Sequence, residues 1–252
     1  MANKNKNKIF LIFVEGTTDE DCLEPLREYY ENKINPANAN IDIRVKNGDI
    51  FTDVINKQKS GKDILKEQIQ NYLNYSKLKP QDIVHVAFIT DTDGIYVNNY
   101  TINRQIDEEF QKDGFQYDLE NKTIVCKNNQ KKESIQRSRQ TKARKISDIL
   151  KSPDKIFIQR APIPYSVYYN SLNLEHVLFN KIIPGEKKTE TLDEFLDKID
   201  ESPDKLIQIF SEKALSNDYQ TSWSEIQNKE MNQGYSNINL LFKLILTMAD
   251  KK

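Results

Sequence analysis

Two continuous apolar segments constrain the fold of this chain more than any other feature of its sequence. They read "IFLIFV" at residues 9–14 and "DIVHVAFIT" at residues 82–90, and each is followed directly by an acid. Apolar runs without polar alternation are typical of strands buried on both faces, as in a parallel sheet covered by helices. Both are far shorter than the ~18 apolar residues of a membrane-spanning helix. We therefore expect an α/β fold and a soluble, cytoplasmic chain with no membrane partner.

Helical and strand patterns alternate along the first part of the chain. After the first apolar run, Leu23, Leu26 and Tyr30 recur at helical spacing. The segment "IDIRV" at 41–45 alternates like a strand, and residues 51–76 again show helical spacing that ends before Pro80. This order of strand, helix, strand, helix and strand predicts parallel strands joined by right-handed crossovers.

The second half of the sequence predicts one further strand of this sheet. "KIFIQ" at 155–159 is expected to be the fourth parallel strand, and Pro162 and Pro164 then predict an extended loop. Asn173 is a suitable residue to begin the next helix. Between the halves, "TIVC" at 123–126 predicts a short strand that precedes a long helix.

The chain is expected to form one main domain. Its 252 residues, 37% of them hydrophobic, can form a single substantial core. We predict a flexible tail over residues 1–8, a domain over 9–185 with an insertion at about 95–150, and a helical extension over 186–252. The apolar segment "INLLFKLILTMA" in this extension predicts core packing, or alternatively the interface of a homodimer. Only two cysteines occur, without a CxxC pair, which indicates a reducing compartment.

Acidic residues follow the predicted strands at the point where each ends. Glu15 follows the first apolar run, Asp91 and Asp93 follow the second, and Glu175 lies after the predicted fourth strand. Ligands of open parallel sheets bind beyond the carboxyl ends of the strands. Oxygen ligands suit hard cations such as Mg²⁺. The local alternative for Asp91 and Asp93 is a solvated turn in which Gly94 takes a left-handed conformation.

These motifs carry a resemblance to a known family. "FVEGTTDEDCL" followed by "FITDTDG" resembles the TOPRIM domain of primases, topoisomerases and nucleases, and the turn "KNGD" also fits. The segment "NSLNLEHVL" looks like the additional acidic helix of the OLD-like and RloB-like phage-defence nucleases. The resemblance implies a TOPRIM-like (Rossmann-like) parallel sheet of about four strands flanked by helices, with a helical C-terminal extension.

The same resemblance implies a function. It predicts a Mg²⁺-dependent endonuclease, with Mn²⁺ as a substitute ion, that cleaves DNA or RNA, tRNA included, in anti-phage defence by abortive infection. Glu15, Asp91 and Asp93 would be catalytic and would bind metal together with Glu175. Three further residues are expected around these ligands: Asp19, Glu20 and His176. The sequence has no GxxxxGK[ST] motif, so any ATPase partner would be a separate chain.

Basic residues concentrate in one segment of a chain whose formal net charge is only −1. Such residues suit contacts with phosphates, which hold nucleic acid without reading its sequence. The alternative is a solvated helix face. The residues expected to contact nucleic acid are Lys46, Lys131, Lys132, Arg137, Arg139, Lys142, Arg144 and Lys145.

Two alternative functions stay open at this point. "AFITDTDGIYV" also resembles the first motif of haloacid-dehalogenase-like phosphatases, in which the first aspartate, here Asp91, is a nucleophile. Against this, two strand–helix units precede the motif and no later acidic pair appears. A TOPRIM-like fold that binds nucleic acid or a partner without catalysis is the second alternative. Trp223 is expected in the core, and His85 is expected to be a structural histidine.

Overall fold

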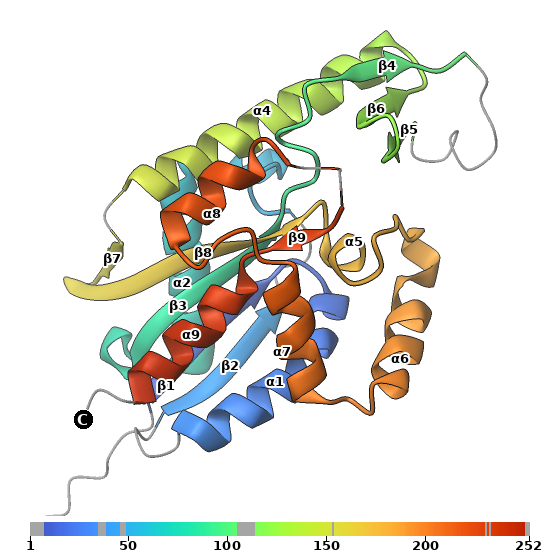
Figure 1. The fold of residues 1–252 in the computed structure, drawn as a ribbon. Coiled ribbons are helices and arrows are strands. Elements are labelled where there is room, and N and C mark those ends of the chain that lie inside the picture. Colours follow the sequence, from blue (N-terminus) through green and yellow to red (C-terminus); the bar gives the residue numbers. More distant parts are fainter. Residues whose placement is uncertain are drawn as a thin grey trace, which may run out of the picture.

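A mixed six-stranded sheet forms the centre of the molecule in the computed structural model, which describes residues 8–34, 39–45, 49–104, 114–152, 154–229, 231 and 233–249. The strand order is β2-β1-β3-β8-β7, and β9 pairs with β8 (Figure 1). Strands β1, β2, β3 and β8 are parallel, whereas β7 and β9 run antiparallel to β8. In chain order the strands are β1 (Lys8–Val14), β2 (Ala39–Val45), β3 (Ile83–Asp91), β7 (Lys155–Ile158), β8 (Ala161–Ser171) and β9 (Tyr235–Ser236).

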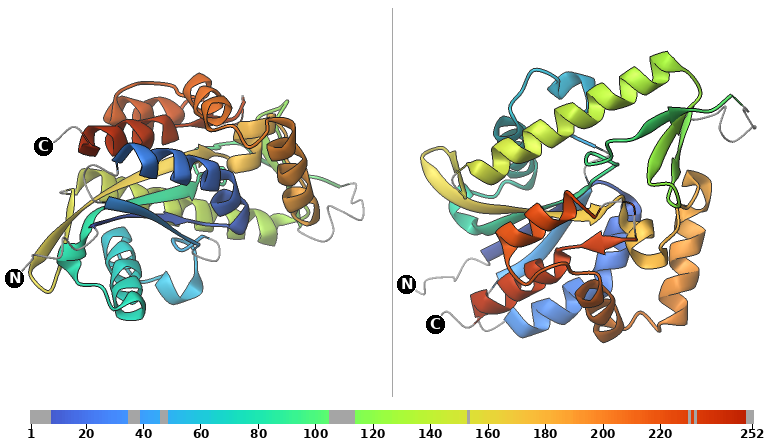
Figure 2. Two further views of the ribbon diagram at one scale, coloured as in Figure 1. Left: turned by 90° about the horizontal axis from the view of Figure 1, so that it is seen from below. Right: turned by 45° about the horizontal axis from the view of Figure 1, so that its top comes forward.

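Helices cover both faces of this sheet, as continuous apolar strands require. One core forms between the sheet and α1 (Thr17–Ile34), α6 (Lys188–Lys198), α7 (Pro203–Glu212) and α9 (Ile238–Ala249). A second core forms on the other face with α2 (Gly61–Ser76), α4 (Asn129–Lys151) and α8 (Tyr219–Ile226). Figure 2 shows α2 on the opposite side of the sheet from α1 and α9. The expected α/β class is therefore confirmed.

The C-terminal helices belong to the main core. Leu206 of α7 and Leu241 of α9 are buried in the same cluster as Leu26 of α1. Trp223 of α8 is also buried, as expected, and packs edge-on against Tyr169. Among the residues that the structure describes, no helix combines the length and apolar character needed to cross a membrane.

A second, smaller sheet lies in the predicted insertion. Its order is β4-β6-β5, with β4 (Tyr100–Ile102), β5 (Phe115–Asp118) and β6 (Thr123–Cys126). The predicted strand at 123–126 is thus confirmed. The sheet lies beside the N-terminal half of α4, away from the main sheet (Figure 1). Ile124 and Cys126 of β6 pack with Ile135 of α4 in a separate small core.

The predicted fourth parallel strand is wrong. Residues 155–158 form β7, an antiparallel edge strand, and the fourth parallel strand is β8, where an extended loop was expected. Pro162 and Pro164 precede Tyr165, where pairing with β3 begins, so their missing N–H groups cost no bond to β3. The connecting turn places Gln159 and Arg160 at positive φ without glycine or asparagine, so the usual hairpin signal is absent.

The expected helix over residues 51–76 is correct only in its second part. Ser60 caps α2, which begins at Gly61, and a short 3₁₀ turn, η2 (Val54–Asn56), precedes it. Asn173 caps α5 (Leu174–Phe179) as predicted, through a bond from the His176 N–H to its side chain. Two more 3₁₀ turns are η3 (Pro80–Asp82) and η4 (Gly185–Lys187).

Candidate functional site

The carboxyl ends of β1, β3 and β8 bring the predicted acids to one edge of the sheet. Glu15 follows β1, Asp91 ends β3, and Glu175 lies in the first turn of α5 after β8. These three strands are neighbours, so their ends are adjacent. A hollow of about 200 Å³ is lined by these three acids together with Asp19.

The turn after β3 holds an unusual backbone. Asp93 and Gly94 have φ values of 49° and 74°, a left-handed conformation that aspartate tolerates and glycine favours. The Thr92 and Asp93 N–H groups donate to the carbonyls of Asn170 and Leu172, which ties this turn to the end of β8. Left-handed backbone in non-glycine residues concentrates at functional sites. The expected glycine turn and the expected site thus occur in the same four residues.

A buried lysine lies among three carboxylates that come from three separate segments. The Nζ atom of Lys142, on α4, is 2.7 Å from Asp93 Oδ2, 3.3 Å from Asp49 Oδ2 and 3.4 Å from Glu15 Oε1. Lys142 is fully buried, which is costly for a charge unless it is paired. Glu15 also accepts a short hydrogen bond from the hydroxyl of Thr90. We name Glu15, Asp49, Asp93 and Lys142 the first charge cluster.

A second lysine forms an ion pair with Glu175 at the same edge of the sheet. Lys188 Nζ, on α6, lies 2.9 Å from Glu175 Oε2, and the hydroxyl of Thr18 lies 3.4 Å from Glu175 Oε1. Asp19 is buried and accepts a bond of 3.0 Å from the Gly16 N–H. A Cβ atom at Gly16 would approach Asp19 Oδ2 to 3.2 Å, so glycine keeps this contact unstrained.

The electrostatics of this edge oppose full ionisation of the acids. Burial raises the pKa of Glu15 to about 8 although Lys142 lowers it, and burial together with Glu175 raises the pKa of Asp19 to about 7. Burial and the charges of Asp19 and Glu15 raise the pKa of Asp91 well above its ordinary value. Burial would also raise the pKa of Asp93, but the ammonium of Lys142 lowers it below the usual range. Crowded carboxylates of this kind bind protons or cations readily.

The donor set fits a hard divalent cation in its chemistry. Glu15, Asp49 and Asp93 each pair with Lys142 Nζ through a carboxylate oxygen. Carboxylate oxygens are the ligands that Mg²⁺ prefers. The ammonium therefore marks a position where three carboxylates already converge on a positive charge. Across the described part of the chain, no three His, Cys, Asp or Glu side chains are arranged as a ready-made metal group. Holding a metal at this position requires Lys142 to move aside, and holding one at Glu175 requires Lys188 to do so.

The predicted nucleic-acid contacts of α4 divide into two groups. Arg137 and Arg144 are exposed, and Lys131 and Lys132 are half-buried on the same helix. Lys142 and Lys145 are buried, so the prediction that they contact phosphate is wrong for this conformation. Lys142 pairs with carboxylates, and Lys145 Nζ donates to the carbonyls of Phe51 and Asn56 at 2.6 and 2.8 Å.

The other predicted site residues have mixed positions. Arg139 is half-buried, donates to the Tyr117 hydroxyl at 2.8 Å and lies over the Phe115 ring, so it braces the small sheet. Lys46 lies outside the described residues. His176 Nδ1 lies 3.0 Å from the carbonyl of Ser171, and burial lowers the pKa of His176 to about 4. This neutral ring therefore stabilises the turn from which the neighbouring Glu175 extends.

Glu20 is half-buried on α1, next to the buried Asp19. It does not line the hollow at this edge, and its place around the ligands stays a prediction.

Sequence reasoning missed Asp49, Lys142 as an ion-pair partner, and Lys188. A signal existed for Lys142, because it lies in register with the buried residues Ile135, Ile146 and Ile149 of α4. A lysine on the apolar stripe of a helix must find a buried partner. Asp49 ends the turn "KNGD", which fits the family resemblance, so a signal existed there too, whereas no comparable pattern marks Lys188.

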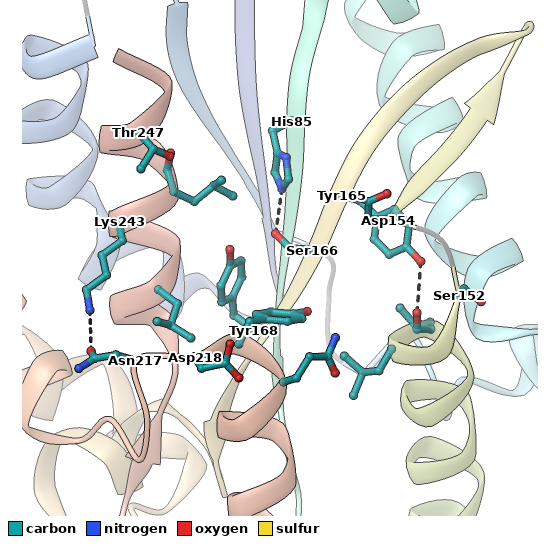
Figure 3. Close-up of a pocket in the computed structure, with 16 residues that line it drawn as sticks. His85, Ser152, Asp154, Tyr165, Ser166, Tyr168, Asn217, Asp218, Lys243 and Thr247 are labelled. Atoms are coloured by element: carbon teal, nitrogen blue, oxygen red, sulfur yellow. Dashed lines mark hydrogen bonds between the residues drawn. The ribbon is translucent and has the colours of Figure 1, made fainter. Parts of the chain in front are cut away.

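A larger hollow lies elsewhere, near the amino-terminal ends of β3 and β8. It measures about 490 Å³ and is lined by the rings of Tyr165, Tyr168 and Tyr219. Figure 3 shows that His85 and Ser166, both in its lining, are hydrogen-bonded to each other, as are Lys243 and Asn217. His85 Nε2 lies 2.8 Å from Ser166 Oγ. His85 is thus a structural histidine, as expected. We name this cavity the aromatic hollow.

Comparison of the chain with protein-family models, curated proteins and solved structures found no match.

Proposed function

We propose that this chain is a Mg²⁺-dependent nuclease of the TOPRIM type that cleaves phosphodiester bonds in DNA or RNA. The observation that carries the proposal is the convergence of Glu15, Asp49 and Asp93 on one buried cation, Lys142 Nζ, at the carboxyl ends of the strands. Glu15 and Asp91, whose pKa values are raised by burial at this edge, are candidates for functional residues.

The residues would divide the work between ion binding and proton transfer. Glu15, Asp91, Asp93 and Glu175 would hold the ions, with Asp49 and Asp19 close to them. Bound Mg²⁺ would supply Lewis-acid stabilisation of the negative charge that develops on the phosphate. Glu15, with its pKa raised to about 8, suits exchange of a proton near neutral pH. Lys188, once displaced from Glu175, would be free to contact a phosphate oxygen.

The wider role rests on the resemblance alone. We propose, on that ground, a cytoplasmic effector of anti-phage defence that works with a separate ATPase chain. Expression of the chain with and without candidate ATPases during phage infection tests this part.

One observation favours a different function. Lys142 and Lys188 already neutralise acids of the site, as they would in a domain that binds nucleic acid or a partner without catalysis. The phosphatase alternative gains nothing comparable, because Glu15 and Asp49 of the first charge cluster precede the motif of Asp91, whereas that family needs an acidic pair after it.

The deciding experiment combines metal titration with cleavage assays. Isothermal titration with Mn²⁺ and incubation of plasmid, single-stranded DNA and tRNA with Mg²⁺ or Mn²⁺ would be compared for the wild type, Asp91→Asn and Glu15→Gln. The nuclease proposal expects binding and cleavage that both variants lose. Cation binding without any cleavage supports the non-catalytic alternative, and absence of both contradicts the metal proposal.

A further inference from the structure

A basic groove leads away from the first charge cluster between η2 and α4. It measures about 440 Å³ and has no acid in its lining, in contrast to the cluster beside it. Lys57 and Arg137 lie on its two walls and are exposed. The remaining lining residues are three hydroxyl residues of α4 and three residues of the opposite segment: Ser134, Ser138, Thr141, Phe51, Thr52 and Val54.

The groove is joined to the charge cluster by direct contacts. The hydroxyl of Thr52, in one wall, lies 2.7 Å from Asp49 Oδ2, and the same oxygen lies 3.3 Å from Lys142 Nζ. Thr141, in the other wall, directly precedes Lys142 in α4. One end of the groove therefore lies next to Asp49 and Lys142 of the first charge cluster.

The α4 wall has the chemistry of a phosphate-binding surface. Its lining residues lie at helical spacings of three and four, so their side chains share one face. Cationic and hydroxyl side chains are the usual donors to phosphate oxygens. The groove lacks exposed aromatic rings, so contacts to the backbone rather than stacking would hold the strand.

The segment that forms the opposite wall carries two adjacent exposed apolar residues, of which Val54 lines the groove itself. Val54 and Ile55 are 84% and 78% exposed, among the largest values for apolar residues in the described chain. Single exposed apolar residues need no explanation, but these two are adjacent and belong to a fixed turn. Apolar side chains of this size insert between base steps in proteins that unstack nucleic acid.

A buried charge fixes this turn in place. Lys145 Nζ bonds the carbonyls of Phe51 and Asn56, one on each side of Val54 and Ile55. Asn56 also donates to the Ile50 carbonyl at 3.0 Å, and Asp53 caps η2. Burying a lysine without an acidic partner is costly. The cost is understandable if the turn has to keep its two apolar side chains at a set position beside the groove.

We propose that this groove binds one strand of nucleic acid by its phosphates, with Val54 and Ile55 against its bases, so that the substrate is unpaired beside the cut. The statement that the bound strand is cleaved rests on the proposed nuclease function. Binding itself requires neither metal nor cleavage, and this allows a separate test.

The test measures the fluorescence anisotropy of a labelled 20-nucleotide single strand and of the matching duplex, in EDTA, at several salt concentrations. Lys57→Ala/Arg137→Ala is expected to raise the Kd for the single strand at least 10-fold. Loss of two phosphate contacts should make the slope of log K against log salt shallower by about 1.4. The matched control is Lys66→Ala/Lys198→Ala, which removes the same charge from exposed positions elsewhere and should change the Kd less than 2-fold.

A second variant tests the apolar turn. Val54→Ser/Ile55→Ser should keep the salt slope and lose the preference for the single strand over the duplex. Equal weakening by the control pair, or no single-strand binding by the wild type, overturns the groove proposal. Groove-dependent binding without cleavage in Mg²⁺ or Mn²⁺ contradicts the nuclease proposal alone, and cleavage that is insensitive to the groove variants contradicts the groove alone.

Discussion

The two ends of the central sheet differ in the side chains that line them, which are charged at one end and mainly aromatic at the other. At the carboxyl ends of the parallel strands, the half-buried Glu15 and Asp93 and the buried Glu175 face two lysines. At the amino-terminal ends of β3 and β8, the aromatic hollow is more than twice as large, with a lining of three tyrosine rings and a neutral histidine–serine pair. The larger cavity therefore lies away from the densest chemistry.

The difference teaches that volume and reactivity are separate signals. The aromatic hollow has few charges, and its lysine is bonded to Asn217 rather than to an acid. The carboxylate edge is narrow, yet its acids have raised pKa values because like charges are held together in a buried place. Catalysis of phosphodiester cleavage needs the second arrangement, since charge has to be ready at the point of reaction.

Replacement of one aspartate at each end of the sheet is expected to give the largest difference in cleavage activity between the two ends. Asp91→Asn is expected to reduce Mg²⁺-dependent cleavage by more than about 100-fold, the upper loss seen for residues that only support a metal ligand. Asp154→Asn, at the aromatic hollow, makes the same chemical change and should leave cleavage within 2-fold of the wild type. Initial rates on the best substrate measure both. Equal losses in the two variants would remove the functional distinction between the ends.

Removal of one lysine at each end compares their charges. Lys142→Met leaves Glu15, Asp49 and Asp93 without their cation, so we expect the metal-free chain to lose about 3–5 kcal/mol of unfolding free energy. Lys243→Met, at the rim of the aromatic hollow, should change it by less than about 0.5 kcal/mol. Urea unfolding in EDTA measures both. Added Mg²⁺ should restore stability to Lys142→Met alone, and a Lys142→Met protein as stable as the wild type would contradict the cluster.

The two ends should also respond to pH in opposite directions. The folded-state pKa values of Asp19 and Glu15 are raised to about 7 and about 8, so the folded chain holds protons that the unfolded chain releases. Stability contributed at this end therefore falls as pH rises from about 4 toward 8. Burial lowers the pKa of His85 from 6.5 to about 4, although Asp154 acts against this. The unfolded chain then binds the proton more readily, and stability falls as pH drops from 6.5 toward 4.

Unfolding free energies measured in EDTA between pH 4.5 and 8.5 check these slopes. His85→Gln should remove an acid-side loss of about 1–3 kcal/mol, given 1.36 kcal/mol per pKa unit. It should leave the alkaline slope unchanged, while Mg²⁺ should flatten that slope. An alkaline slope of the opposite sign would show that the acids of the carboxylate edge are ionised without cost.

The sequence predicted the carboxylate edge better than the aromatic hollow, for a physical reason. The two apolar runs became β1 and β3, which are neighbours, so the acids that follow them had to meet. Strand geometry thus turns a local pattern into a spatial prediction. The hollow has no such pattern, because it forms between α4, α8, α9 and β8, which are distant in the sequence.

The errors share one cause as well. Lys142 meets Glu15 across 127 residues of sequence, and no local rule separates it from the solvated lysines of the same helix except its place on the apolar stripe. Strand β8 was missed because its prolines suggested a loop and its hairpin turn lacks glycine. In both cases a tertiary contact overrode the preference of the local sequence.

Removal of a single hydroxyl group at the aromatic hollow has the smallest predicted effect. It tests whether the two ends of the sheet act independently. Beyond the short pairing with β7, the outer edge of β8 is closed by side chains: Tyr219 donates to the Val167 carbonyl at 2.7 Å and accepts from its N–H at 3.0 Å. Tyr219→Phe removes both bonds, while Trp223 still donates to the carbonyl. We expect a loss of about 1–2 kcal/mol of unfolding free energy, since one buried N–H loses its acceptor.

The matched control for this change is Tyr75→Phe, whose side chain is 85% exposed and should cost nothing measurable. Thermal unfolding with the cleavage assay checks both variants. Cleavage by Tyr219→Phe should stay at the wild-type rate at temperatures below its transition, because the hydroxyl acts on the strand edge and not on the acids. A loss of cleavage without a loss of stability would instead connect the aromatic hollow to the carboxylate edge along β8, and the two ends would then have to be treated as one functional unit.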